Sequence, residues 1–263
     1  MSDYMQKDPN ISNAERQDRL IHLIEQQGRI AVTQISDQFS VSPATARRDL
    51  EALAEQGRVQ RVHGGAIALR QAPPEAPVLQ RAAEYVEEKQ RIGRRAAELV
   101  ADGETVFLGS GTTVLEVARN LRQHRGLTVI TNSLLVINAL ADLPDLTLVA
   151  LGGLYRASEM SFIGHVAEQS LAEVRADKVI LGIRALDVEH GLTNAYLPET
   201  MTDRAILRIG REVIIAADHT KCGRLSTAFV APLSAVHTLV TGTEAAPDFI
   251  AALAAKGLRV ITA

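Results

Sequence analysis

The amino-acid sequence predicts an α/β protein with two domains, in which a small helical domain ending in a β-hairpin precedes a larger domain with a mostly parallel sheet. Three observations carry this prediction. Residues 13–70 contain three short helical patterns and a hairpin signal at a glycine pair. Residues 71–83 are rich in proline and predict a linker. Residues 84–263 alternate helical segments with short apolar runs, as in sheets that helices cover on both faces.

The composition is that of a globular protein and narrows the classes of function. The 263 residues are 46% hydrophobic and 22% charged, and the formal net charge is -3, so a DNA-binding surface would have to be local. Cys222 is the single cysteine, which excludes internal disulfides and indicates a reducing compartment. No apolar run approaches the roughly 18 residues that cross a bilayer, and no signal peptide is apparent. We therefore expect a cytoplasmic protein.

The first helix has clear signals at both ends. Residues 1–12 are polar and aperiodic, and they are expected to form a disordered tail. Ser12 followed by Glu15 is a capping-box pattern, in which the first side chain accepts a hydrogen bond from the start of the helix. The pattern predicts a helix over Asn13–Gln27 that ends at Gly28.

Two further short helices follow in the same domain. Thr33 is expected to cap a brief helix. Ser42 is expected to cap the third helix, with Pro43 at the first helical position and the end at Gly57. One face of that third helix carries apolar residues at helical spacing, namely Ala46, Leu50, Leu53 and Ala54.

The opposite face of the third helix is suited to DNA. At 100° per residue, Ala44, Thr45 and Arg48 lie on the outward face of the first turns, and Arg47 lies on the flank. The small residues, Ser42 among them, would let the helix N-terminus approach a duplex. There Arg48 can contact a guanine edge, and Arg47 can contact a phosphate.

A basic β-hairpin is predicted after the third helix. Residues 58–62 and 66–69 alternate around Gly64 and Gly65, which can adopt the positive φ of a tight turn. Its basic residues are Arg58, Arg61, His63 and Arg70, with no acidic residue between positions 57 and 70. The order and size of these elements predict a winged helix-turn-helix that binds DNA. The alternative is a solvated basic face, neutralised by the nearby acids Asp49, Glu51 and Glu55.

The larger domain is predicted from consecutive apolar runs that read as buried parallel strands. Their positions are 105–109, 127–131, 146–151, 178–183, 212–218, 237–241 and 258–262. Open parallel sheets bind ligands in a crevice at the carboxyl ends of their strands. We therefore expect an anionic effector among the polar loops at that edge. The candidates are Ser110, Gly111, Thr112, Thr113, Thr131, Asn132, Ser133, Gly152, Gly153, Glu199, Asp218 and Lys221.

Each candidate also has an ordinary structural interpretation. Ser110–Thr113 can form a common strand-to-helix turn, and Asn132 can cap a helix. Asp218 can stabilise a turn, and Lys221 can be solvated. Glu199 can complement a helix dipole in its first turn. The histidines lack metal-ligand spacing, so no metal or cofactor is expected.

The chain resembles the DeoR family of bacterial transcriptional regulators. The amino-terminal domain carries VSPATARRDLEALAEQGRVQRVHGGA, and the larger domain carries FLGSGTT, VITNSL, LGG, DKVILGI, GLT and AADHTKCGR in order. The resemblance implies a second domain similar to the ribose-5-phosphate isomerase and CoA-transferase-like fold, which senses a phosphorylated sugar or related metabolite. Glu199 matches an acidic position of the family. The implied function is a repressor of carbohydrate-catabolism genes that binds double-stranded operator DNA, without a membrane partner.

Two positions depart from the family pattern. Gly109 stands where members commonly have an acid, and Asp203 stands where they have a lysine. These changes leave the effector open and weaken the alternative hypothesis of a sugar-phosphate isomerase-like enzyme with a DNA-binding appendage. That enzyme would have to use Glu199 and Asp218 for acid–base chemistry. A homodimer or homotetramer is expected, because one such DNA-binding domain contacts too little DNA for tight specific binding.

Overall fold

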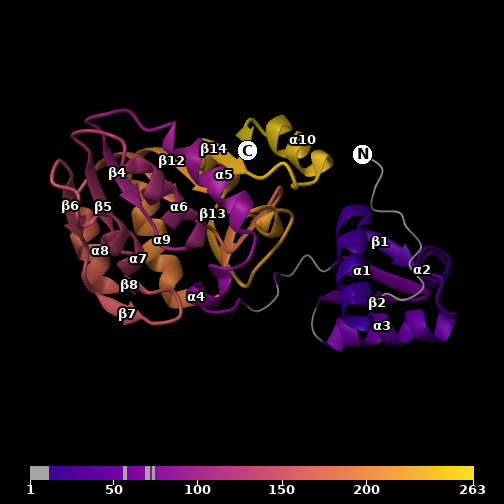
Figure 1. Cartoon of the computed structure of the whole chain (residues 1–263). Coiled ribbons are helices and arrows are strands. Elements are labelled where there is room, and N and C mark those ends of the chain that lie inside the picture. Colours follow the sequence, from indigo (N-terminus) through magenta and orange to yellow (C-terminus); the bar gives the residue numbers. More distant parts are fainter. Residues whose placement is uncertain (1–11, 56–57, 69–71, 73–74) are drawn as a thin grey trace. The chain divides into compact units, whose positions relative to one another are not determined.

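The computed structural model describes residues 12–55, 58–68, 72 and 75–263 (Figure 1). The chain divides into two compact units, Met1–Pro73 and Pro74–Ala263, and each unit is described by itself. The tail predicted before Ser12, the end of the third helix at Gly57, and Leu69 and Arg70 at the end of the hairpin lie outside the described residues.

The first unit is a winged helix-turn-helix. Its strands form one antiparallel sheet in the order β1-β3-β2, so the hairpin pairs with the short strand that precedes α2. The elements are α1 (Asn13–Gln27), β1 (Arg29–Ala31), α2 (Val32–Phe39), α3 (Pro43–Glu55), β2 (Val59–Val62) and β3 (Gly65–Ala68).

The helix signals at α1 are found where they are predicted. Ser12 Oγ accepts from the Glu15 N–H at 3.2 Å, and Gly28 ends the helix with a φ of 71°. The predicted cap of α2 at Thr33 is wrong, because α2 begins one residue earlier at Val32. The Gln34 side chain instead accepts from the Ala31 N–H at 2.8 Å, which satisfies a backbone donor at this end.

An apolar core and a partly buried ion pair hold the first unit together. Leu20 and Ile24 of α1, Ile35 of α2 and Leu50 of α3 are fully buried in one cluster. Beside it, Arg16 Nε donates to Asp49 at 2.7 Å and clamps α1 to α3.

The second unit is built on a seven-stranded parallel sheet in the order β15-β14-β12-β9-β4-β5-β6. All seven predicted runs supply its strands. The strands are β4 (Thr105–Leu108), β5 (Thr128–Thr131), β6 (Thr147–Ala150), β9 (Ala176–Leu181), β12 (Gly210–Ala216), β14 (Thr238–Thr241) and β15 (Arg259–Thr262).

Helices cover both faces of this sheet, as consecutive apolar runs require (Figure 1). Within β4, Val106 and Leu108 belong to the cluster that contains α5 and α6, whereas Phe107 belongs to the cluster on the other face. The helices are α5 (Val86–Ala97), α6 (Thr112–Leu121), α7 (Leu134–Leu140), α8 (His165–Ala172), α9 (Leu197–Ile209) and α10 (Pro247–Ala255), with short 3-10 turns η1 (His219–Lys221) and η2 (Leu233–Ala235).

Two small antiparallel sheets were not among the predicted elements. They consist of three- and four-residue strands, too short for an alternating pattern to stand out. One sheet pairs β7 with β8, and the other has the order β10-β11-β13. The strands are β7 (Leu154–Arg156), β8 (Ser161–Ile163), β10 (Ala185–Asp187), β11 (Gly191–Asn194) and β13 (Ala228–Ala231).

The segment before α5 belongs to the second unit. Residues 71–83 are predicted from the sequence as a linker, but α4 (Val78–Arg81) buries its first and last residues in the second unit. The Val78 N–H donates to Ser158 O at 2.7 Å, and Arg81 Nε donates to Ala76 O at 2.8 Å. Docking of this segment brings Glu75 to the sheet.

Candidate functional site

The outward face of α3 is exposed and basic, as its helical pattern predicts. Ser42, Ala44, Arg47 and Arg48 are exposed, and Thr45 is half-buried. Ser42 Oγ accepts from the Thr45 N–H at 3.1 Å, so the start of the helix is capped by a small polar side chain. The short side chains leave the helix N-terminus open to a large partner.

The acids of α3 do not neutralise these arginines. Asp49 is turned inward to Arg16. Glu51 Oε1 lies 3.6 Å from Arg61 Nη1 of the wing, which is the hairpin of β2 and β3. Across the residues that the structure describes, neither Arg47 nor Arg48 has an ion-pair partner. Both guanidinium groups are therefore available to phosphates or base edges.

The wing is fixed to α3. Arg61 Nη1 donates to the backbone carbonyl of Arg47 at 3.1 Å, and Arg61 is half-buried. Arg58 and His63 are exposed, and Gly64 turns the hairpin with a φ of 80°. Arg61 thus positions the wing, whereas Arg58 and His63 face solvent.

The second unit has a pocket at the carboxyl edge of its parallel sheet, where the strand order changes direction. From β4 the chain continues outward through β5 and β6, and then returns to place β9 on the other side of β4. The loops after β4 and β9 therefore diverge and leave a crevice, which is where open α/β sheets bind ligands. Ser110, Thr112 and Arg184 from these loops line the pocket.

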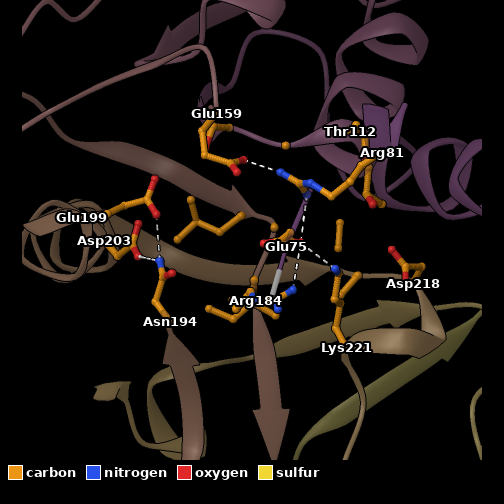
Figure 2. A pocket seen from close by; sticks show the side chains of 18 of the residues that line it. Glu75, Arg81, Thr112, Glu159, Arg184, Asn194, Glu199, Asp203, Asp218 and Lys221 are labelled. Carbon is orange, nitrogen blue, oxygen red and sulfur yellow. Dashed lines mark hydrogen bonds and ion pairs between the residues drawn. The ribbon is translucent and has the colours of Figure 1, made fainter. Parts of the chain in front are cut away.

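Two buried arginines and one largely buried lysine surround one carboxylate in this pocket (Figure 2). Glu75 Oε1 lies 2.7 Å from Lys221 Nζ, 3.0 Å from Arg81 Nη1 and 3.2 Å from Arg184 Nη1. Arg81 also pairs with Glu159, and its backbone carbonyl accepts from Lys89 Nζ at 2.7 Å. We call Arg81, Arg184 and Lys221 the cation cluster.

Burial and neighbouring charges shift the pKa values of Glu75 and Arg184 in opposite directions. Burial alone would raise the pKa of Glu75, but the charges of Lys221, Arg81 and Arg184 outweigh it and hold that pKa below its ordinary value. Burial lowers the pKa of Arg184, against the attraction of Glu75. The Glu75 carboxylate therefore stays ionised at neutral pH and compensates the buried cations.

The other end of the pocket is acidic (Figure 2). Asn194 Nδ2 donates to Glu199 and to Asp203, each at 2.9 Å, and Glu199 also pairs with Arg156. Burial, reinforced by repulsion from Glu199, raises the pKa of Asp203 to about 8. Asp203 is thus mostly protonated at neutral pH and can donate as well as accept hydrogen bonds.

Two pocket atoms are buried without a hydrogen-bond partner among the described residues. They are Oδ1 of Asn132 and Nε of Arg184. The Asn132 amide is oriented by its Nδ2, which donates to Phe162 O at 2.9 Å. A pocket with one unpaired acceptor and one unpaired donor suits a polar ligand that can form hydrogen bonds to both atoms.

The predicted effector residues divide into two sets. The set that lines the pocket is Ser110, Gly111, Thr112, Thr113, Asn132, Glu199, Asp218 and Lys221. Gly111 caps α6 with a φ of 114°, and Asp218 Oδ1 accepts from the Thr220 N–H at 3.1 Å, so both also have the structural roles weighed above.

The remaining four predicted residues do not line the pocket. Thr131 Oγ1 donates to Leu108 O at 2.6 Å, and Ser133 caps α7. Gly152 lies after β6 away from the lining, and a side chain at Gly153 would approach Ile163 O to 2.7 Å. Thr131, Ser133 and Gly153 thus have local structural roles, and a position at a strand end does not by itself distinguish such a role from lining the pocket.

Sequence reasoning missed much of the pocket charge. Glu75 and Arg81 lie in the stretch predicted as a linker, and Arg156 and Glu159 lie around two strands that were not predicted. Only Arg184 had a usable signal, because it closely follows a predicted strand. Cys222 lines no part of the pocket, and burial raises its pKa to about 12, so its thiol stays protonated.

Comparison with known proteins assigns both units. Residues 16–72 match the DeoR-like helix-turn-helix domain, and residues 84–243 match the DeoR C terminal sensor domain. The chain belongs to the DeoR family of transcriptional regulators. It is a DNA-binding regulator and not an enzyme, so the isomerase alternative is not retained.

The chain is similar over most of its length to known repressors. The glycerol-3-phosphate regulon repressor of Escherichia coli K12 is 36% identical over 88% of this chain and 91% of its own length. The transcriptional repressor AccR of Agrobacterium fabrum is 35% identical over 88% of this chain and 90% of its own. A solved ribose 5 phosphate isomerase A from Neisseria gonorrhoeae aligns with 53% of each chain at 15% identity and a TM-score of 0.38, which is a weak structural likeness.

The described residues contain neither a candidate membrane-spanning helix nor a candidate metal site. No described helix is long and apolar enough to cross a membrane. No group of three or more His, Cys, Asp or Glu side chains in the described ranges is arranged to hold a metal ion.

Proposed function

We propose that this DeoR-family protein represses carbohydrate-catabolism genes in the cytoplasm and that a phosphorylated sugar or related metabolite binds its pocket. The observation that carries the effector class is the pairing of two chemistries in one crevice. The cation cluster and the start of α6 offer positive charge and N–H donors, and the Asn194–Asp203 end offers hydrogen-bonding groups. A phosphate fits the first end, and sugar hydroxyls fit the second.

For the DNA-binding unit, we propose that α3 enters the major groove. Arg48 would contact base edges there, and Arg47 would contact the phosphate backbone. Ser42, Ala44 and Thr45 would allow close approach of the helix start, with Arg58 and His63 reaching the backbone from the wing. Support comes from the exposure of both arginines and from their lack of an ion-pair partner among the described residues.

We further propose that the protein acts as a homodimer or homotetramer on double-stranded operator DNA. A single winged helix-turn-helix contacts one half-site, and two-fold operators match two-fold proteins. Light scattering of the full chain with and without operator DNA tests this part. A strict monomer in both conditions at micromolar concentration would contradict it.

A thermal-shift screen tests the effector class. The full chain is heated with phosphorylated sugars, each matched with its unphosphorylated counterpart. A ligand at a hundred times its dissociation constant stabilises the folded state by about 2.7 kcal/mol, which is readily detected. A hit is then added to a gel-shift titration on DNA from the protein's own promoter region. Stabilisation by the unphosphorylated partners alone, or no effect of the hit on DNA affinity, would contradict the proposal.

A further inference from the structure

The Glu75 carboxylate contacts the three cations that could otherwise bind the negative group of a ligand. We propose that Glu75 is an internal occupant of an anion site formed by Arg81, Arg184 and Lys221, and that the phosphate group of the effector displaces it. The proposal rests on the function proposed above, in which this pocket binds a phosphorylated molecule. It adds the residues of the phosphate site and a competitor within the chain.

The cation cluster depends on Glu75 for its charge balance. Among the described residues, Glu75 is the only carboxylate within ion-pair distance of Arg184 and of Lys221. Their side chains are 7% and 15% exposed. Buried cations require a compensating anion, so the site must hold either this carboxylate or another negative group.

A phosphate satisfies the cation cluster better than the carboxylate does. All three ion pairs converge on one oxygen, Oε1 of Glu75. A phosphate monoester offers three acceptor oxygens and about 1.5 to 2 negative charges, so each cation can receive an oxygen of its own. Arg184 Nε, which is buried without a partner among the described residues, supplies a further donor. The same cluster thus favours the incoming ligand over its internal occupant.

The position of Glu75 in the chain connects this exchange to the rest of the protein. The two units divide between Pro73 and Pro74, so Glu75 lies at the very start of the second unit. On its other side the chain is held by the buried Val78 and by the bond from Arg81 to Ala76 O. When a phosphate displaces Glu75, the second unit loses an ion-pair contact close in sequence to the boundary between the units. Binding of the effector phosphate and docking of the Glu75 side chain in the cation cluster are therefore mutually exclusive.

Calorimetric titration of the full chain with inorganic phosphate tests the competition directly. A carboxylate that occupies the site nine-tenths of the time weakens an incoming anion about tenfold, because only the undocked fraction binds. We expect Glu75→Gln to bind phosphate about tenfold more tightly than the wild type. Glu87→Gln removes an exposed carboxylate from α5, outside the pocket lining, and should leave the affinity within about twofold. Unchanged or weaker binding in Glu75→Gln overturns the proposal.

A second variant covers the case in which Glu75→Gln does not fold. Glu75→Asp keeps the charge but is one methylene shorter, so it docks less completely and should give a gain of about threefold. No gain in this folded variant also overturns the competition.

Lys221→Ala separates this proposal from the function on which it rests. If Lys221→Ala weakens phosphate but neither Glu75 variant strengthens it, the pocket binds anions and only the competition is wrong. If Lys221→Ala leaves phosphate binding unchanged, the phosphate assignment of the pocket is wrong, and the proposal falls with it.

Discussion

The two units of the chain keep their cations in opposite environments. In the first unit, Arg47, Arg48 and Arg58 point into solvent, and α3 directs its acids to other partners. In the second unit, Arg184 and Lys221 are enclosed and meet at a single carboxylate. Exposed cations attract a polyanion of any sequence and release its counterions, so their affinity depends on salt. Enclosed cations select a small anion that fits between them.

The first unit also has one partly enclosed cation, Arg16, which pairs with the buried Asp49, and breaking this pair gives the largest expected effect. Asp49→Ala leaves the Arg16 guanidinium uncompensated between α1 and α3. We expect the first unit to lose about 3 kcal/mol of stability. Chemical denaturation followed by circular dichroism measures the loss. Glu55→Ala, on the exposed side of the same helix, is the control, and equal losses in both variants would contradict the clamp.

Arg48→Ala tests the exposed cations. Because Arg48 lies opposite the buried face of α3, the fold should be unchanged, while discrimination of the operator falls by about 2 kcal/mol. Arg47→Ala should weaken operator and unrelated DNA alike and reduce the salt dependence. Gel-shift titrations at several salt concentrations separate the two effects. Retention of full sequence specificity in Arg48→Ala would remove it from base recognition.

Lys221→Ala tests the enclosed cations. A charge-assisted contact contributes about 1.5 kcal/mol or more, so a phosphorylated effector should bind at least about tenfold more weakly. The unphosphorylated sugar should be barely affected, and so should DNA binding without effector. Thr112→Ala should act in the same direction but less, because neighbouring N–H groups of α6 remain. Calorimetry with the matched ligand pair decides, since equal losses for both ligands would mean that Lys221 supports the sugar or the fold.

An effect that depends on pH is expected at the acidic end of the pocket. The folded-state pKa of Asp203 is about 8, above its ordinary value of 3.8, so the folded protein binds the proton more tightly. This contribution to stability is greatest below pH 3.8 and is lost as the pH rises towards 8. Asp203→Asn removes this ionisation, so it should stabilise the protein relative to the wild type much more at pH 9 than at pH 5. Melting curves of both proteins at the two pH values measure it, and a gain independent of pH would contradict the assignment.

The fold could be predicted further than the pocket. The parallel strands were recognisable because burial on both faces leaves runs such as Val106–Leu108 without polar interruption. The first helix was bounded by Ser12 and Gly28, whose roles depend on local geometry alone. The hairpins β7–β8 and β10–β11 were not recognisable because their strands are too short to show an alternating pattern, and β13 pairs with β11, which is far from it along the chain.

The charges of the pocket could not be predicted for the same reason. Glu75 stands among prolines in the sequence, and its importance arises only where the chain docks beside Arg184 and Lys221. Thr131 ends β5 and Asn132 follows it, yet the Thr131 side chain bonds to the backbone of β4 and Asn132 lines the pocket. The point at which the strand ends separates the two roles, and the residue pattern does not give that point to a single residue.

The hydrogen bond from Arg61 to the backbone carbonyl of Arg47 fixes the separation between α3 and the wing. The wing is held at one side by this bond and at the other by the pairing of β3 with β1, so its tip cannot slide along α3. One step of the double helix advances each strand by about 3.4 Å. A half-site lengthened by a single base pair would therefore bring the helix or the wing into register, but not both. Under the proposed mode of DNA binding, the spacing of an operator would thus be set by a side chain that need not contact a base.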